Sequence, residues 1–250
     1  MSIQDKLKDR INNNYDNRNN YSTTVQSRTL NVPEGVGFFK PYYDKINEIA
    51  ILPYVVETDN DPEVKKGEET YTLTYFRHVN IGPTKDSFVC LNRTFGKACP
   101  ICEEIDRLKE DYEENKKIIV SLNPKKRSVF NILDRRSENP DQIEIFDTPF
   151  YNNPPGSFPK ELLEETVDPE TKEIICFPDP TANGYWIKFR AAEQTFDKGK
   201  YSIYKSFKFV RRKEAIKEEI LKKVFQQLLN GQGLRIFTST TSDIPSARTW

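Results

Sequence analysis

The sequence has little cysteine, a single histidine and no long hydrophobic run. Four cysteines in 250 residues are too few for a disulfide scaffold. No stretch approaches the roughly 18 apolar residues of a membrane span, and the longest apolar run, Ile49–Val56, is interrupted by Pro53. The first thirty residues contain no apolar segment of signal-peptide length. These absences predict a soluble, intracellular protein with no membrane partner.

The chain also has no net charge. The chain has 38 Lys and Arg against 38 Asp and Glu, so its formal charge is zero. This balance excludes a histone-like polycation and an acidic solvating chain, and as a total it does not favour nucleic-acid binding. With 36% hydrophobic and 30% charged residues, the chain is polar but can still bury a core.

Catalytic motifs are missing as well. There is no phosphate-binding loop, and Gly231-Gln232-Gly233 lacks the third glycine of a dinucleotide turn. The one histidine falls beside the cysteine cluster, which leaves none for a Ser/His or Cys/His pair. The sequence therefore predicts a protein that is not an enzyme.

The clearest motif is a set of metal ligands. His78, Cys90, Cys99 and Cys102 are spaced H-x11-C-x8-C-x2-C, and Cys99-Pro100-Ile101-Cys102 forms the tight turn that aims two thiolates at one ion. Zinc prefers four such ligands in a tetrahedron. Because four protein ligands leave no position open for water, we expect one structural Zn²⁺ and no metal catalysis.

These residues allow other interpretations. The cysteines could be core thiols beside an exposed histidine. A thioredoxin-like redox pair at Cys99 and Cys102 would leave Cys90 and His78 without a role. Nucleobase deamination is rejected, because Asn80 stands where the general-base glutamate is required. Cys176 is isolated and is expected to be a small buried side chain.

Short apolar and β-branched segments predict a mainly β fold with few helices. The expected strands are Ile49–Leu52, Thr70–Phe76, Val129–Leu133, Ile143–Phe146, Trp186–Ala191 and Tyr201–Val210. The expected helices are Cys102–Lys117, a short one near Lys160–Glu165, and residues 212–229. We interpret this order as an OB-fold-like β-barrel with an inserted zinc-binding subdomain.

The predicted domain organisation has three parts. Residues 1–34, rich in asparagine, form a flexible N-terminal arm. Residues 35–230 form the OB-fold core, which includes the zinc subdomain at about 76–117. Residues 231–250 form a C-terminal extension.

The zero net charge conceals local charge. Lys116–Arg136 carries a net of +6 and Trp186–Lys213 a net of +7, whereas Glu103–Glu114 and Glu161–Glu173 each carry −5. The basic segments are mostly predicted strands, and the acidic ones are helical or connecting. Charge is therefore segregated.

The basic strands also carry aromatic residues. Strand alternation places Trp186, Lys188 and Arg190 on one face. On the next strand the more polar set is Ser202, Tyr204, Ser206 and Lys208. Cations that track phosphates beside rings that stack on bases suit single-stranded nucleic acid, although a solvated charged strand would show the same pattern.

Several of these residues match a known family in order along the chain. The match runs over about residues 36–210 through the His78…Cys90…Cys99-Pro-Ile-Cys102 set, Lys125-Lys126-Arg127, Phe130–Leu133 and Cys176-Phe177-Pro178 before Tyr185–Arg190. In these elements the sequence resembles the replicative single-stranded DNA-binding (helix-destabilising) proteins of T-even-like tailed phages. The zinc set is the specific part of the resemblance.

The resemblance implies an OB-fold with a zinc subdomain that coats single-stranded DNA, without sequence preference, in a basic and aromatic cleft. By motif position the cleft includes Lys125, Lys126 and Arg127, together with Phe196 and Tyr201. It further implies a role in phage DNA replication, recombination and repair in the cytoplasm of an infected bacterium, with other copies of the chain and phage replication proteins as partners. The alternative is a zinc-ribbon module that binds a protein or RNA.

Two features depart from the family pattern. The family has a compact Lys/Arg-rich motif near its N-terminus, where this chain has asparagines with scattered Lys6, Lys8, Arg10 and Arg18. The family also has an acidic tail that recruits partners, and the last residues here, Ser246–Trp250, are not acidic.

Overall fold

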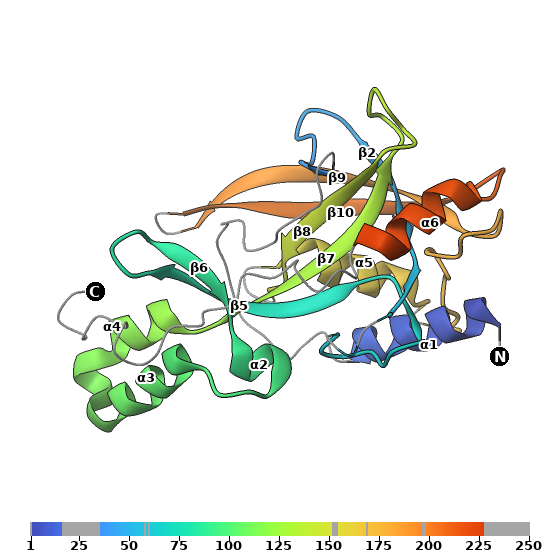
Figure 1. Ribbon diagram of the computed structural model, residues 1–250. Coiled ribbons are helices and arrows are strands. Elements are labelled where there is room, and N and C mark those ends of the chain that lie inside the picture. The colour runs from blue at the N-terminus through green and yellow to red at the C-terminus, as the bar shows by residue number, and fades with distance from the viewer. Residues whose placement is uncertain are drawn as a thin grey trace.

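The fold is mainly β, with helices at its edges and on its faces (Figure 1). The computed structural model describes residues 2–16, 36–57, 59, 61–151, 155–168, 170–196 and 199–227. In this part of the chain no helix combines the length and apolar character that a membrane span needs.

One mixed sheet of eight strands forms the body of the molecule, and its path runs β1-β8-β7-β2-β9-β10, with β5 and β6 beside it. Its strands are β1 (Gly37–Phe38), β2 (Asn47–Leu52), β5 (Leu73–Ile81), β6 (Asp86–Val89), β7 (Lys125–Asp134), β8 (Ile143–Pro149), β9 (Tyr185–Phe196) and β10 (Gly199–Arg211). A separate pair consists of β3 (Tyr54–Val55) and β4 (Glu69–Thr70).

Strand β7 is the centre of this sheet. One edge of β7 pairs with β8, and its other edge is shared end to end by β5, at residues 125–129, and β2, at residues 131–134. Nearly every residue of β7 is buried, which explains its long run with little alternation of polarity. The helix-rich segment between β6 and β7 therefore attaches directly to the central strand.

The predicted mainly β fold with few helices is confirmed, but a closed barrel is not. Within the described residues the path ends at β1 on one side and β10 on the other, and no backbone pairing joins these ends. Strand β1 pairs with β8 in parallel, which makes the sheet mixed. The space between β8 and β10 is bridged by side chains and by α5 (Phe158–Thr166), which packs against both strands.

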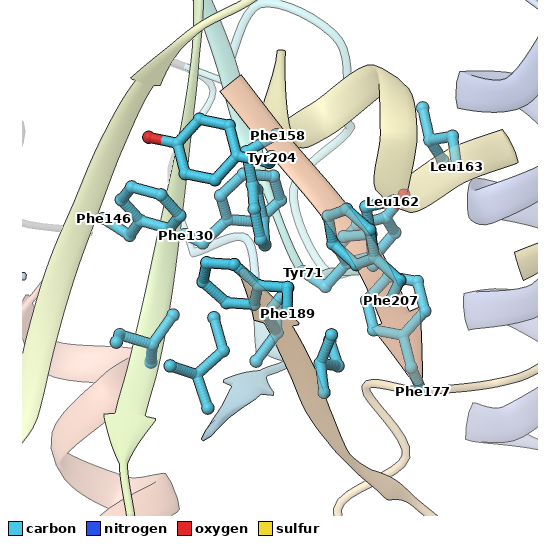
Figure 2. Close-up of a cluster of buried hydrophobic side chains, with 14 of the residues drawn as sticks. Tyr71, Phe130, Phe146, Phe158, Leu162, Leu163, Phe177, Phe189, Tyr204 and Phe207 are labelled. Atoms are coloured by element: carbon cyan, nitrogen blue, oxygen red, sulfur yellow. The ribbon is translucent and has the colours of Figure 1, made fainter. Parts of the chain in front are cut away.

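Aromatic rings fill the concave face of the sheet (Figure 2). Phe158, at the start of α5, lies with its ring centroid 4.7 Å from Phe146 of β8 and 5.5 Å from Tyr204 of β10. It also contacts Phe130 of β7 and Phe189 of β9. Rings from four strands thus contact one residue of α5. This packing connects β8 and β10, which are not joined by backbone hydrogen bonds.

A β-bulge in β10 changes the predicted facing of that strand. Lys205 pairs with Arg190 and Lys208 with Lys188, so β10 contains one extra residue between them. Ser206 takes the extra position with φ 60°, in the left-handed region. Tyr204 consequently points into the core while Lys208 remains exposed, and the prediction that they share a face is wrong.

The prediction of a flexible arm at residues 1–34 is wrong for its first part. Ile3–Asp16 form helix α1, in which Leu7 and Ile11 are fully buried and join the main core. The helix contacts α5 and β4. The helix is rich in asparagine, and Leu7 and Ile11 form a short apolar stripe at i,i+4 spacing. The surface against which they pack comes from segments far along the chain. Residues 17–34 of the predicted arm lie outside the described residues, as does the predicted extension 231–250.

The opposite face of the sheet carries a second, smaller core. Helix α6 (Glu218–Gln227) buries Ile220 and Val224 against Ala50 and Leu52 of β2. Alternation along β2 sends Ile49 and Ile51 to the main core and these two residues to the other face.

The remaining helices gather beside β6 at one end of the molecule (Figure 1). They are α2 (Leu91–Phe95), α3 (Pro100–Leu108) and α4 (Tyr112–Leu122), with a 3-10 turn, η2, at Lys109–Asp111. The sequence predicted one helix over Cys102–Lys117, and η2 divides it into two. Their apolar sides pack together in a separate small core that includes Ile101, Ile105, Leu108, Ile119 and Leu122.

Removing the buried side chain of Leu7 tests the docking of α1. We expect Leu7→Ala to lower the free energy of unfolding by about 2–5 kcal/mol, because it leaves a cavity in a packed core. Asn12→Ala, at an exposed position of the same helix, is the matched control and should change stability by less than about 0.5 kcal/mol. Urea denaturation measures both, and equal stabilities for the two variants would mean that α1 is not docked.

Candidate metal centre and adjoining groove

The four predicted metal ligands meet in one cluster. His78 comes from β5, Cys90 immediately precedes α2, and Cys99 and Cys102 lie at the start of α3. One ligand atom from each residue lies within 4.8 Å of all the others. Segments up to 24 positions apart in sequence are therefore joined at a single point.

The separations fit a tetrahedral zinc ion. The Sγ atoms of Cys90 and Cys102 are 3.4 Å apart, and Nε2 of His78 lies 3.5 Å from Sγ of Cys99 and 3.7 Å from Sγ of Cys102. A tetrahedron with ordinary zinc bond lengths places two sulfurs about 3.8 Å apart and a sulfur and a nitrogen about 3.6 Å apart. The cluster can therefore hold a metal ion with little movement.

Local structure aims each ligand. Pro100 occupies the first turn of α3, where its missing N–H costs nothing, and Cys99 is the N-cap residue. The Sγ atom of Cys90 accepts a hydrogen bond from the backbone N–H of Arg93, 3.3 Å away. Nδ1 of His78 lies 2.7 Å from the carbonyl oxygen of Leu122, to which it can donate, leaving Nε2 as the ligand atom.

The environment of the cluster favours a cation. Hydrogen bonds with the sulfurs of Cys102 and Cys90 hold the pKa of the Cys99 thiol well below its usual range. Burial lowers the pKa of His78, but hydrogen bonds with the sulfurs of Cys90 and Cys99 outweigh it and raise that pKa to about 9. Metal ligands must be deprotonated, so binding of an ion at this site would release protons.

His78, Cys90 and Cys99 are buried and Cys102 is half-buried, with no fifth ligand required. A set of four protein ligands that leaves no position open for water is typical of structural metal sites.

A groove of about 790 Å³ lies where the sheet fails to close. Its walls are the segment that follows β1, the edge of β8 and the beginning of β10. Aromatic residues on these walls include Phe38, Tyr43 and Tyr201. Tyr43 is 52% exposed, and its hydroxyl lies 2.6 Å from Oγ of Ser202, which holds the ring across the gap.

The groove has four basic side chains against two acidic ones. The basic residues are Lys40, Arg77, Arg127 and Lys200, and the acidic residues are Asp147 and Glu193. Both carboxylates are already engaged: Asp147 lies 2.6 Å from Nε of Arg127, and Glu193 lies 2.9 Å from Nζ of Lys200. The groove is therefore a basic surface lined with rings.

Arg77 links the groove to the metal cluster. Alternation along β5 directs His78 toward the cluster and Arg77 toward the groove. Burial, with the nearby charge of Arg127, lowers the pKa of Arg77 to about 10, so it remains charged at neutral pH. Two guanidinium groups held together in this way favour an anionic ligand. A metal that anchors His78 also positions the neighbouring cation.

The predicted DNA contacts are only partly brought together. Arg127 and Tyr201 both line the groove. Lys125 lies beside α4, where its Nζ donates to the carbonyl oxygen of Val120 at 3.4 Å. Lys126 points to the opposite face of β7 and lines a different hollow. The side chain of Phe196 lies outside the described part of the structure.

The predicted strand face of Trp186, Lys188 and Arg190 lies away from the groove. Trp186 packs against the second core beneath the guanidinium of Arg135, 5.2 Å from the ring centroid. Lys188 pairs with Glu48 at 3.6 Å, and Arg190 is exposed. The alternation was correct, but it could not distinguish the concave face from the outer one.

Sequence reasoning missed most of the groove. Phe38 and Tyr43 precede the first long strand, and no pattern in the sequence marks them as groove residues. Arg77 adjoins a predicted metal ligand, which was a usable signal because neighbouring strand residues point to opposite faces. Nothing in the sequence indicates that Lys40 and Lys200 line the same groove.

Removing one ligand tests the metal cluster. We expect one Zn²⁺ per chain by mass spectrometry of the metal content, and less than a tenth of that in Cys99→Ser. Cys176→Ser is the matched control, because Cys176 is buried in the main core away from the cluster. A folded wild-type chain that contains no metal would contradict the ligand assignment.

No protein-family model and no curated protein sequence matches the chain.

Proposed function

We propose that the chain binds single-stranded DNA without sequence preference in the groove between β1, β8 and β10. In this proposal it coats and protects the strand during phage DNA replication, recombination and repair, in the cytoplasm of the infected bacterium. The protein acts by binding and performs no chemistry on the DNA.

The observation that carries the proposal is the combination of rings and cations in one groove. Single strands expose unstacked bases and a charged backbone, so aromatic side chains and basic side chains together can bind them in any sequence. Tyr43 and Tyr201 offer the rings. The four basic side chains outnumber the two carboxylates in the lining, and of the four, Lys40 and Lys200 are exposed. The half-exposed ring of Tyr43 is accessible to a base.

The sheet supports the same interpretation. OB-folds are partly open five-stranded barrels that bind oligonucleotides on one strand face and its flanking loops. The curved sheet here stays open between β8 and β10, and the open side is the groove. We regard it as an OB-like sheet whose unclosed seam serves as the binding site.

We further propose that the metal is a single structural Zn²⁺. Three sulfurs and one imidazole nitrogen are the donor set that zinc prefers. The ion would hold β5 against α3 and α4 and thereby fix the groove wall at Arg77.

An alternative function is a zinc module that binds a protein partner. Tyr112 and Val120, which are 43% and 54% exposed, are the large apolar side chains that α4 leaves uncovered. They lie on α4, which packs against the ligand-bearing helix α3, and not among the residues that line the groove. RNA is a further alternative, because stacking and phosphate contacts do not distinguish the sugars.

Removing a ring from the groove tests DNA binding. We expect Tyr43→Ser to weaken binding of fluorescent oligo-dT about 5- to 150-fold, because stacking contributes about 1–3 kcal/mol per base. Fluorescence anisotropy at two salt concentrations gives the affinity and its salt slope, which should be steep.

Two variants control for this result. Tyr43→Phe keeps the ring and removes only the hydroxyl contact with Ser202, so its affinity should stay close to that of the wild type. Tyr112→Ser removes an exposed tyrosine outside the groove and should also bind normally. No binding of oligo-dT by the wild type at low salt would refute the proposal, and equal affinity for oligo-U would extend it to RNA.

A further inference from the structure

A second hollow, of about 390 Å³, lies between α1, the loop before β4, β5, β7 and α5. It lies on the opposite side of β7 from Arg127. Lys126 and Ser128 alternate with Arg127 along the strand, and Thr74 of β5 pairs with Ser128 on the same face. Its volume is within the range of small-molecule sites.

Two cations reach this hollow from different elements. Lys126 is only 8% exposed, and its Nζ lies 4.3 Å from the ring centroid of Phe150. Arg10 comes from α1 and pairs with Glu63 at 2.5 Å. Glu63 is the one carboxylate among the lining residues, so the hollow retains an excess of positive charge.

Part of this polar lining is left unsatisfied. Nε of Arg10 is buried and has no hydrogen-bond partner among the described residues. A buried donor without a partner costs about 1–3 kcal/mol. Burial, with the nearby charge of Arg10, lowers the pKa of Lys126 to about 8, and Glu63 only partly opposes this. An anion placed between Arg10 and Lys126 would give Nε of Arg10 a partner and would be attracted by the charge of the lysine.

We propose that this hollow is a binding site for a phosphate monoester, separate from the DNA groove. Arg10 and Lys126 provide charge-assisted hydrogen bonds to phosphate oxygens, and the hydroxyls of Thr74 and Ser128 line the same floor. Phe150 and Leu162 form an apolar wall suited to the organic part of the ligand.

The site makes two sources of phosphate possible: a free nucleotide and the 5′ end of a DNA strand. Both present the same dianionic group. Thymidine 5′-monophosphate and inorganic phosphate represent the first, and a 5′-phosphorylated oligo-dT compared with its 5′-hydroxyl form represents the second.

Isothermal titration with inorganic phosphate and thymidine monophosphate tests the proposal on the full chain. We expect both to bind, thymidine without phosphate not to bind, and Lys126→Met to weaken phosphate binding at least tenfold. Lys125→Met is the matched control, because Lys125 points to the other face of β7, and its affinity should be unchanged. Arg10→Gln, on a helix surface, should also weaken binding and provides a second variant should Lys126→Met fail to fold.

The outcomes are distinct. Absence of phosphate and nucleotide binding at about 10 mM, or equal binding by Lys126→Met and wild type, would overturn the proposal. A gain in affinity for the 5′-phosphorylated oligonucleotide assigns the site to strand ends, and no gain assigns it to free nucleotides. Tyr43→Ser should leave phosphate binding intact, so failure of the groove and failure of this site are separable.

Sulfate, which keeps its charge across neutral and mildly basic pH, gives a pH test of the same site. The charged groups that face Lys126 are Arg10 from α1 and Glu63 from the loop. Because Lys126 loses its proton as the pH rises through about 8, sulfate affinity should fall up to tenfold per pH unit above that value. In Lys126→Met the affinity should be weak and independent of pH over the same range.

Discussion

The contact of Phe158 with rings from four strands is the constraint on which the rest of the molecule depends. The sheet is strongly curved, yet its two ends do not hydrogen-bond to each other within the described residues. Phe158 of α5 joins Phe146 of β8 to Tyr204 of β10 across this gap. The groove lies along the part of the gap that these rings do not fill. The packing that stabilises the sheet and the proposed binding site therefore share one gap.

The metal cluster constrains the position of β5 through His78. That strand shares the edge of β7 with β2 and has few other partners, so its far end is held by β6 and by the helices that carry the cysteines. His78 and Arg77 are adjacent and face opposite ways. Coordination of His78 by the proposed ion would therefore restrict the position of Arg77 without contacting it. The proposed zinc would affect DNA binding only by fixing the position of Arg77 in the groove wall.

Although the net charge of the chain is zero, its basic and acidic side chains are distributed unevenly between surfaces. Within the groove, Arg127 forms an ion pair with Asp147. Arg77 adds a further positive charge to the groove, and burial of this guanidinium lowers its pKa. On the other face of β7, Lys126 and Arg10 share one carboxylate. The two hollows are thus both short of negative charge and lie back to back across one strand. A neutral total is compatible with two anion-binding sites.

The sequence by itself determined the four residues of the metal cluster, the mainly β character and the alternation of side chains along β9. These depend on short-range spacing, which the backbone preserves. The tertiary structure alone decided that Leu7 and Ile11 dock, since their partners lie in α5 and β4. It also decided which strand face is concave, so Trp186 packs against the second core and Tyr201 lines the groove. The bulge at Ser206 reversed the facing of part of β10, and no periodic pattern predicts one extra residue. Curvature and long-range pairing arise from the packing of distant segments, and local sequence does not contain them.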